Sequence, residues 1–314
     1  MPVNVISSNT VKTELDEVLY TNFDYADMPG IIHAENPIVF KQDSTQLESV
    51  NSEEYMGPGN FDTHDAEEER IIATLRVGNE KTHSVLNYKK TLRWPQEFME
   101  DDKFDVIKQS VAAVGMRGRT TRDKKAIFVY MDGFSSTTTS DAVALWSNSH
   151  IALNGDTVDN LETGALSVAN LKIMFRKLQV QPAQDGELGS HQPVALVLGP
   201  TLFPSALEIT KSELIADKTD NNLNYFSTIY PGLQVLQSPY HDSTYFSAAG
   251  YYADTAYYLI SKNHSIKRWT RLEMDTETVG PSTDTRDRWM YKARFREVVS
   301  PVSWEGAIGN SGNA

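Results

Sequence analysis

The sequence predicts an α+β fold with a mixed sheet, and three observations support this prediction. Apolar side chains recur every three or four positions in residues 100–131 and 161–178, which indicates two helices. Residues 194–198 form a continuous apolar run that is typical of a strand buried on both faces. Beyond residue 230, strand-like runs alternate with turn-forming Pro, Gly and Asn, so most of the remaining chain is expected to be β.

Composition excludes several classes of protein. The 314 residues include 40% hydrophobic residues, enough for a sizeable core, and no cysteine. Disulfides, thiolate nucleophiles and cysteine-ligated metal sites are therefore excluded. We find no apolar run of about 20 residues that would span a membrane, and no secretory signal, so we expect synthesis in the cytoplasm.

The net charge of −13 is unevenly distributed along the chain. Residues 1–70 hold 15 acidic side chains against three basic ones, a net charge of −12. Residues 71–132 carry +4, from 12 basic and eight acidic side chains. A globular nucleic-acid-binding protein would usually show the opposite sign.

Residues 1–60 are predicted to be an extended arm that becomes ordered by lying on another surface. Apolar residues are scattered there, and turn formers interrupt them at Pro29–Gly30, Pro37 and residues 57–59. A disordered tail is the alternative.

A β-hairpin is predicted within residues 61–98. Residues 71–77 and 84–94 have strand-like composition, residues 78–81 have turn-like composition, and Pro95 ends the second strand. A two-stranded hairpin is marginal alone, so it needs a further surface, on its own domain or on a neighbour. We expect it to supply contacts between subunits through its basic side chains and one aromatic: Arg76, Lys81, Lys89, Lys90, Arg93 and Trp94.

Residues 99–193 are predicted to contain the two long helices and a polar loop. The first helix begins near Glu100 and ends near Gly133, with Gly115 and Gly118 as points where it bends or breaks. Residues 134–160 are rich in Ser, Thr, Asn, Asp and Gly, and form the loop. Residues 194–314 add the buried strand, a third helix with Pro204 in its first turn, and strands near residues 233–236, 256–260, 266–269 and 289–299.

No familiar catalytic motif can be fitted: the sequence lacks a phosphate-binding glycine loop, His-Glu-x-x-His and Gly-x-Ser-x-Gly. We therefore predict no catalytic, cofactor-binding or metal-binding residues. Three weak candidates exist, each better explained as polar surface or a turn. They are a metal site at Asp62, His64 and Asp65; a hydroxyl–imidazole pair among Ser147, Ser149 and His150; and a calcium loop at Asn154, Asp156, Asp159 and Glu162.

An aromatic cluster between residues 240 and 258 has two interpretations. Base stacking on these rings would need nearby Lys or Arg to neutralise phosphate, and residues 219–261 contain almost none. Packing in the core or between subunits is therefore favoured.

The order of parts resembles a known family: an acidic arm, a basic hairpin, a long helix and then a compact α+β region. It resembles the major capsid protein of tailed bacteriophages, with the HK97 fold of the Mu-like head subunit type. The stretches that resemble it are residues 144–150 with Asn160, residues 194–200, residues 230–235 and residues 295–307. The resemblance covers about residues 60–307.

The resemblance implies a structural role and a domain organisation. Residues 1–60 would be the N-terminal arm and residues 61–98 the hairpin called the E-loop, both reaching over neighbours. Residues 99–193 would form the peripheral (P) domain with its spine helix, completed by C-terminal strands. Residues 194–314 would form the axial (A) domain and the closing strands. The protein would then be no enzyme and need no cofactor.

The same resemblance implies partners and a location. Copies would assemble into hexamers and pentamers of an icosahedral shell that encloses the phage genome, built in the host cytoplasm and carried in the virion. The arm looks too short to include a fused scaffold, so either a separate scaffold protein or none is expected. A portal and decoration proteins are further possible partners, and no membrane is involved. The acidic arm of one subunit would attract the basic hairpin of another.

Packaged DNA is a further expected partner, contacted non-specifically on the inner face. Residues 103–125 hold seven Lys or Arg against Asp105 and Asp123. Ordinary ion pairing is the favoured interpretation of this basic stripe, because a net acidic subunit should not hold DNA that must later leave.

Three rival functions stay open, of which the third is a tail or decoration protein that particle size would distinguish. An encapsulin-like nanocompartment shares the fold but encloses a protein cargo, and a metal-dependent hydrolase would use Asp62, His64 and Asp65. Some members of the family join a hairpin lysine covalently to an asparagine of a neighbour. Lys89 and Lys90 lie in a comparable region, but the sequence does not position the asparagine.

Overall fold

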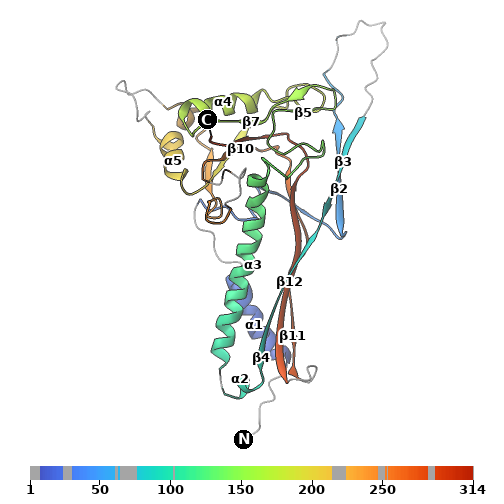
Figure 1. The fold of residues 1–314 in the computed structure, drawn as a ribbon, viewed down its shortest axis with the longest axis vertical. Coiled ribbons are helices and arrows are strands. Elements are labelled where there is room, and N and C mark those ends of the chain that lie inside the picture. Colours follow the sequence, from blue (N-terminus) through green and yellow to red (C-terminus); the bar gives the residue numbers. More distant parts are fainter. Residues whose placement is uncertain are drawn as a thin grey trace.

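The protein consists of a broad body and a long stem that extends from it (Figure 1). The computed structural model describes residues 8–23, 30–60, 63, 76–101, 103–213, 224–246, 252, 254–281 and 287–313. Within these ranges no helix has both the length and the apolar composition that a bilayer crossing requires. The predicted α+β class with mixed sheets is confirmed.

The body is built on a five-stranded mixed sheet. Its strand order is β7-β13-β10-β8-β9, with β8–β9 and β13–β7 parallel and the other pairs antiparallel. The strands are β7 (Leu161–Glu162), β8 (Pro193–Leu198), β9 (Gln234–Gln237), β10 (Tyr257–Ser261) and β13 (Ala307–Asn310). The helices of the body are α4 (Val168–Gln179), α5 (Phe203–Lys211) and α6 (Tyr225–Ile229), and a small separate pair of strands is β5 (His150–Ile151) with β6 (Thr157–Val158).

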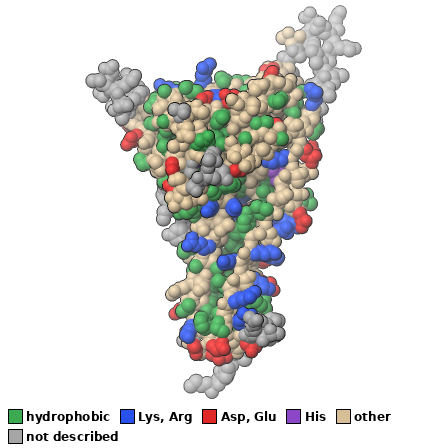
Figure 2. Space-filling model, viewed as in Figure 1, with side chains coloured by type: hydrophobic (Ala, Val, Ile, Leu, Met, Phe, Trp, Pro, Cys, Tyr) green, Lys and Arg blue, Asp and Glu red, His purple; other side chains and the backbone are tan. Residues whose placement is uncertain are grey.

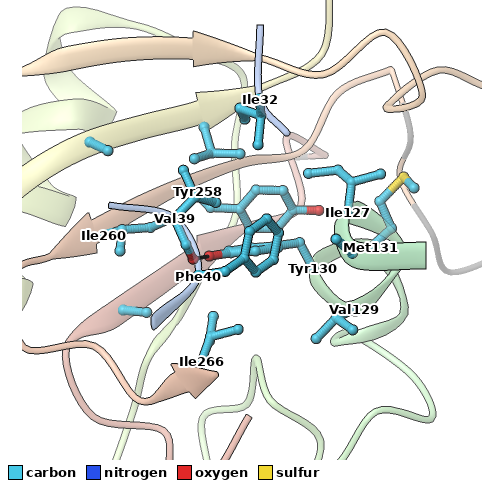
Figure 3. Packing of buried hydrophobic residues seen from close by; sticks show 14 of the residues in the cluster. Ile32, Val39, Phe40, Ile127, Val129, Tyr130, Met131, Tyr258, Ile260 and Ile266 are labelled. Atoms are coloured by element: carbon cyan, nitrogen blue, oxygen red, sulfur yellow. Dashed lines mark hydrogen bonds between the residues drawn. The ribbon is translucent and has the colours of Figure 1, made fainter. Parts of the chain in front are cut away.

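Alternate side chains of the body sheet enter two different cores. Tyr257 and Leu259 of β10 pack with residues of α4, α5 and α6, whereas Tyr258 and Ile260 face the end of α3. Figure 3 shows this second core, where the Tyr130 hydroxyl donates to the Val39 carbonyl at 2.7 Å. Both faces are covered, which explains why residues 194–198 are apolar without interruption.

The stem pairs a four-stranded sheet with two long helices and one short one. Its strand order is β1-β11-β12-β4, and β1 is the parallel member. The strands are β1 (Lys41–Ser44), β4 (Leu86–Pro95), β11 (Ile266–Val279) and β12 (Arg288–Pro301); the helices are α1 (Ser8–Phe23), α2 (Glu97–Glu100) and α3 (Phe104–Asp132). Because β11, β12 and α3 are long, they run from the stem into the body and join the two (Figure 1).

The prediction of an extended arm is wrong for its first part, which is α1. Val11, Leu15, Leu19 and Phe23 recur every fourth residue and are at most 4% exposed. They fill the stem core against α3 and the sheet. This spacing is present in the sequence, but many polar residues lie between the four apolar ones. The surfaces of α3 and the sheet supply the burial that holds this helix.

The long helix predicted for residues 100–131 is confirmed as α3, without a break at its two glycines. A Cβ atom at Gly115 would lie 2.6 Å from the Leu19 carbonyl oxygen, and one at Gly118 would lie 2.8 Å from the Met274 side chain. The glycines therefore allow α1 and β11 to approach closely instead of bending the helix. By contrast, the helix predicted from residue 161 begins only at Val168, capped by Ser167, since residues 161–162 belong to β7.

The predicted hairpin pairing is also wrong. Residues 76–84 form β3 and pair with β2 (Ser49–Met56), whereas β4 continues from β3 into the stem and pairs with β12. Residues 78–81 lie within β3, and a register irregularity between Glu53 and Tyr55 of β2 accommodates residues 78 and 79. Gly78 is needed for a close approach to the body, because a Cβ atom there would lie 2.3 Å from the Leu153 side chain. The hairpin of this chain is therefore β2–β3, and half of it comes from the predicted arm.

Candidate intersubunit surfaces

The hairpin β2–β3 turns its polar face toward its own body. Glu54 is 5% exposed and accepts a hydrogen bond from the Ser140 hydroxyl, and burial raises the pKa of its carboxyl. The Lys81 ammonium donates to the Thr138 carbonyl, to the Ser300 hydroxyl at 3.2 Å and to the Pro301 carbonyl at 3.4 Å. Burial lowers the pKa of Lys81 to about 8.

His83 completes this inner contact. Its ring stacks on Trp269 of β11 with centroids 4.6 Å apart, and its Nε2 lies 2.7 Å from the Ser52 hydroxyl. Burial, with help from the charges of Lys81 and Lys267, lowers the pKa of His83 to about 4. The imidazole is therefore neutral at pH 7, so the inner face adds no third cation beside these two lysines.

The outer face of the hairpin exposes two apolar side chains. Tyr55 and Val77 are direct cross-strand partners, and they are 69% and 62% exposed. Beside them Glu53 faces Glu80 across the two strands, and both are exposed. Like charges directly opposite each other destabilise a strand pair. An exposed apolar pair beside two facing carboxylates makes this face suited to contact with a further molecule.

The six residues predicted to make contacts between subunits divide into two groups. Arg76, Lys89, Lys90 and Arg93 are exposed. Lys81 binds oxygens of its own chain, as described above. Trp94 is 5% exposed and lies in the stem core, so the expectation that it makes an intersubunit contact is corrected. Alternation along β4 places its ring on the helix side of the sheet.

A groove of about 890 Å³ runs between α3 and the edge strand β4. Its floor includes Leu92, Val114 and Phe295. Its basic lining residues are Lys89, Lys90 and Arg117, and no lining residue is acidic. Neither the groove nor the outer face of the hairpin has a signature in the sequence, because both arise where distant segments meet.

Much of the basic stripe on α3 is used for ion pairs inside the chain. Arg122 is 2% exposed and pairs with Glu35, with Glu273 at 2.8 Å and with Glu297 at 3.2 Å. Burial alone would lower the pKa of Arg122, but these three carboxylates outweigh burial and hold it above its ordinary value. Figure 2 shows Lys and Arg along this face of the stem and Asp and Glu at its tip.

Acidic residues of the predicted arm are likewise engaged within the chain. Glu14 lies 3.3 Å from Lys108, and Asp16 accepts hydrogen bonds from Tyr291 and Thr276 at 2.6 Å. Glu35 pairs with Arg122. These contacts reduce the negative charge that the arm has available to attract a neighbour.

The weak catalytic candidates find no support in the described residues. Asp62, His64 and Asp65 lie outside them, so the predicted metal site has no structural account. The His150 imidazole is fully buried between the Asp141 carboxylate at 2.7 Å and the Leu145 carbonyl at 3.2 Å. The Ser147 and Ser149 hydroxyls contact each other.

The remaining candidate, the predicted calcium loop, is a turn. Asn154 bonds to Asp156, while Asp159 and Glu162 both bind Lys177. Among the described residues no three His, Asp or Glu side chains are grouped as metal ligands.

Comparisons with solved structures identify the fold. The capsid asymmetric unit of cyanophage Pam1 matches with a TM-score of 0.55 and 15% identity, over 91% of this chain and 93% of that one. The capsid of Ralstonia phage GP4 matches with a TM-score of 0.55 and 12% identity, over 91% and 92%. A virus-like particle from Pyrococcus furiosus matches with a TM-score of 0.52 and 9% identity, over 95% and 98%.

These matches, with the stem, body and hairpin, define the class of fold, which is the HK97-like capsid fold. A search of curated proteins found no match. The model of the phage capsid protein family matches residues 79–310, which is most of the chain. The chain belongs to this family, and it is a structural protein of the major capsid type.

Proposed function

We propose that this chain is the subunit from which hexamers and pentamers of a closed icosahedral shell are built around a phage genome. Family membership supports the structural role. The observation on which the proposal rests is the hairpin β2–β3, which exposes the apolar pair Tyr55 and Val77 while Glu54 is buried and Lys81 is half-buried. If the chain acted as a monomer, the opposite arrangement would make its fold more stable. Burying a charged side chain destabilises the fold, whereas burying an apolar side chain stabilises it.

A neighbouring copy is the partner that would cover this face. In an assembly each hairpin would bury Tyr55 and Val77 against the adjacent subunit, and a cation from that subunit would separate the charges of Glu53 and Glu80. Arg76, Lys89, Lys90 and Arg93 are the exposed candidates for this cation. Each such surface ion pair contributes only about 0–1 kcal/mol. The shell would therefore be stabilised by many copies of the same weak contact acting together.

The test is electron microscopy of the purified chain. We expect closed particles of uniform size from the native sequence. The double variant Tyr55→Ser/Val77→Ser should remain folded and lose the particles, because both side chains are exposed within the chain. The matched control Tyr55→Phe/Val77→Ile keeps the face apolar and should still form particles. Closed particles from the serine variant would overturn the assigned contact, and a monomeric native chain at every salt concentration would overturn the function.

The remaining partners are proposals of the same kind. The particle would carry a portal and be assembled with a separate scaffold and decoration proteins in the host cytoplasm, with packaged DNA held non-specifically on its inner face. The chain would act by assembly and not by catalysis. Nucleic acid extracted from particles made in infected cells distinguishes a genome container from a nanocompartment, which would contain a defined protein cargo instead.

A further inference from the structure

The folded chain places on the aromatic cluster the cations that residues 219–261 lack. The Lys124 ammonium of α3 lies 5.5 Å from the centroid of the Tyr245 ring and 5.1 Å from the centroid of the Phe246 ring. Lys125, the next residue of α3, lies over the Phe128 ring at 5.9 Å. Phosphate neutralisation, which the aromatic segment cannot provide alone, is therefore available in the tertiary structure.

Three basic residues of α3, which we call the α3 ridge, are available for an external anion: Arg117, Lys124 and Lys125. Arg117 and Lys125 are exposed and Lys124 is partly exposed. Among the described residues none of the three forms an ion pair, whereas the other four basic residues of the stripe contact acidic side chains or, in one case, the His33 ring. Arg117 and Lys124 are about two helical turns apart, so they share one face of α3 at a separation of about 10.5 Å.

The carboxylates around the aromatic segment are engaged by other groups. Asp123 is 7% exposed and binds the His33 ring at 2.7 Å and the Ala34 N–H at 2.9 Å. Asp242 accepts the N–H of Thr244 at 2.8 Å, and Asp254 accepts the N–H of Ser243 at 2.9 Å. The cations of the α3 ridge therefore have no carboxylate partner among the described residues.

We propose that the α3 ridge binds the phosphate backbone of duplex DNA, and that the Tyr245 and Phe246 rings hold Lys124 in position by cation–π contact. A separation of about 10.5 Å is close to three phosphate steps along one strand, at about 3.4 Å each. This inference deepens the proposed function and rests on it for the presence of a genome beside the subunit.

Two features favour DNA over an acidic polypeptide as the ligand. The ammonium groups of Lys124 and Lys125 lie over the rings, so the ridge presents positive charge and little apolar surface, which suits phosphate contacts that carry no sequence preference. Three cations in each copy also make a weak contact that salt disrupts. Such a contact is compatible with later release of the DNA from a subunit whose net charge is −13.

Fluorescence anisotropy with a short labelled DNA duplex tests the contact, at concentrations of the full chain low enough that microscopy shows no particles. Arg117→Gln/Lys124→Gln should weaken binding about tenfold at low salt and reduce the slope of log affinity against log salt by about 1.8, since two phosphate contacts are lost. The matched control is Lys172→Gln/Arg176→Gln on α4, which covers the opposite face of the body sheet. Lys172 also lies over a tyrosine ring, that of Tyr225 at 5.9 Å, and this variant should bind DNA as the native chain does.

Substitution of Tyr245 tests the role of the rings. Tyr245→Ala should weaken DNA binding about two- to fivefold, because Lys124 loses one of its two rings, and Tyr245→Phe should restore it.

Equal affinities of the native chain and the ridge variant would overturn the inference. It would also be overturned if polyglutamate bound the native chain more tightly than DNA and lost affinity in the ridge variant, because the ridge would then belong to an acidic protein. Closed particles from a chain that does not bind DNA sink this inference alone, whereas a chain that never forms particles sinks the proposed function.

Discussion

The backbone carbonyl of Leu19 lies where a side chain on Gly115 would begin, 2.6 Å from the position of its Cβ atom. Helices α1 and α3 therefore cross in direct backbone contact at this point. The contact brings Leu15 and Leu19 into the stem core and closes one side of the stem.

The first prediction concerns this crossing. Gly115→Ala should destabilise the protein by about 1–3 kcal/mol, because the new methyl group forces two backbones apart. In an open helix the same change would stabilise by about 1 kcal/mol. Urea unfolding measures the difference. Gly118→Ala is the comparison and should cost less, since its nearest contact is the mobile end of Met274. A rise in stability for Gly115→Ala would contradict the close approach.

The second prediction concerns α1 itself. Leu15→Ala should cost about 2–5 kcal/mol, because the side chain is fully buried and leaves a cavity. Deleting residues 1–55 should yield insoluble protein, because the deletion removes α1, β1 and most of β2. Glu17→Ala, at an exposed position of the same helix, is the control and should change the unfolding free energy by less than about 0.5 kcal/mol. A soluble, cooperatively unfolding truncated chain would show that α1 is dispensable.

The third prediction concerns the ion cluster that links stem and body. Arg122→Met should cost about 3–5 kcal/mol, because it leaves Glu297, 3% exposed, with one cation fewer. Burial raises the pKa of Glu297 against the opposing charges of Arg122 and Arg268. Arg117→Met on the same helix is the exposed control. Equal thermal unfolding temperatures for the two variants would refute a special role for the cluster.

The fourth prediction concerns pH. Burial, together with the charge of Glu54, raises the pKa of Glu305 to about 7. The folded chain therefore binds this proton more tightly than the unfolded chain, so the contribution to stability is complete below about pH 4.5 and is lost as pH rises to about 7. The full shift corresponds to at most about 3 kcal/mol. His83 and His264, whose pKa values burial lowers to about 4, act in the opposite direction.

The variant Glu305→Gln isolates the effect of Glu305. Urea unfolding at pH 5 and pH 8 should show that the native chain loses more stability, or gains less, than the variant over this interval. The histidine contributions are common to both chains and cancel in the comparison. Parallel pH profiles for the two proteins would show that Glu305 titrates at its ordinary pKa in the folded state.

Local sequence patterns predicted the elements whose burial is periodic or complete. The spacing of apolar residues in α3 and the continuous run in β8 indicated their structures, and both are confirmed. The resemblance of scattered stretches also led to the correct family, because the order of elements persists where individual residues do not. No local sequence pattern indicates the outer face of the hairpin or the α3–β4 groove.

The sequence by itself determined the fold class, the body strands β8, β9 and β10, the long helix, the absence of thiol chemistry and the family. The tertiary structure alone decided that α1 is a helix, that β3 pairs with β2, and which faces remain exposed. The physical reason is that strand pairing and burial depend on the surface that a segment meets, and that surface comes from distant parts of the chain. Gly78 illustrates this: alone it resembles a turn residue, whereas beside Leu153 it is the residue that lets a strand lie against the body.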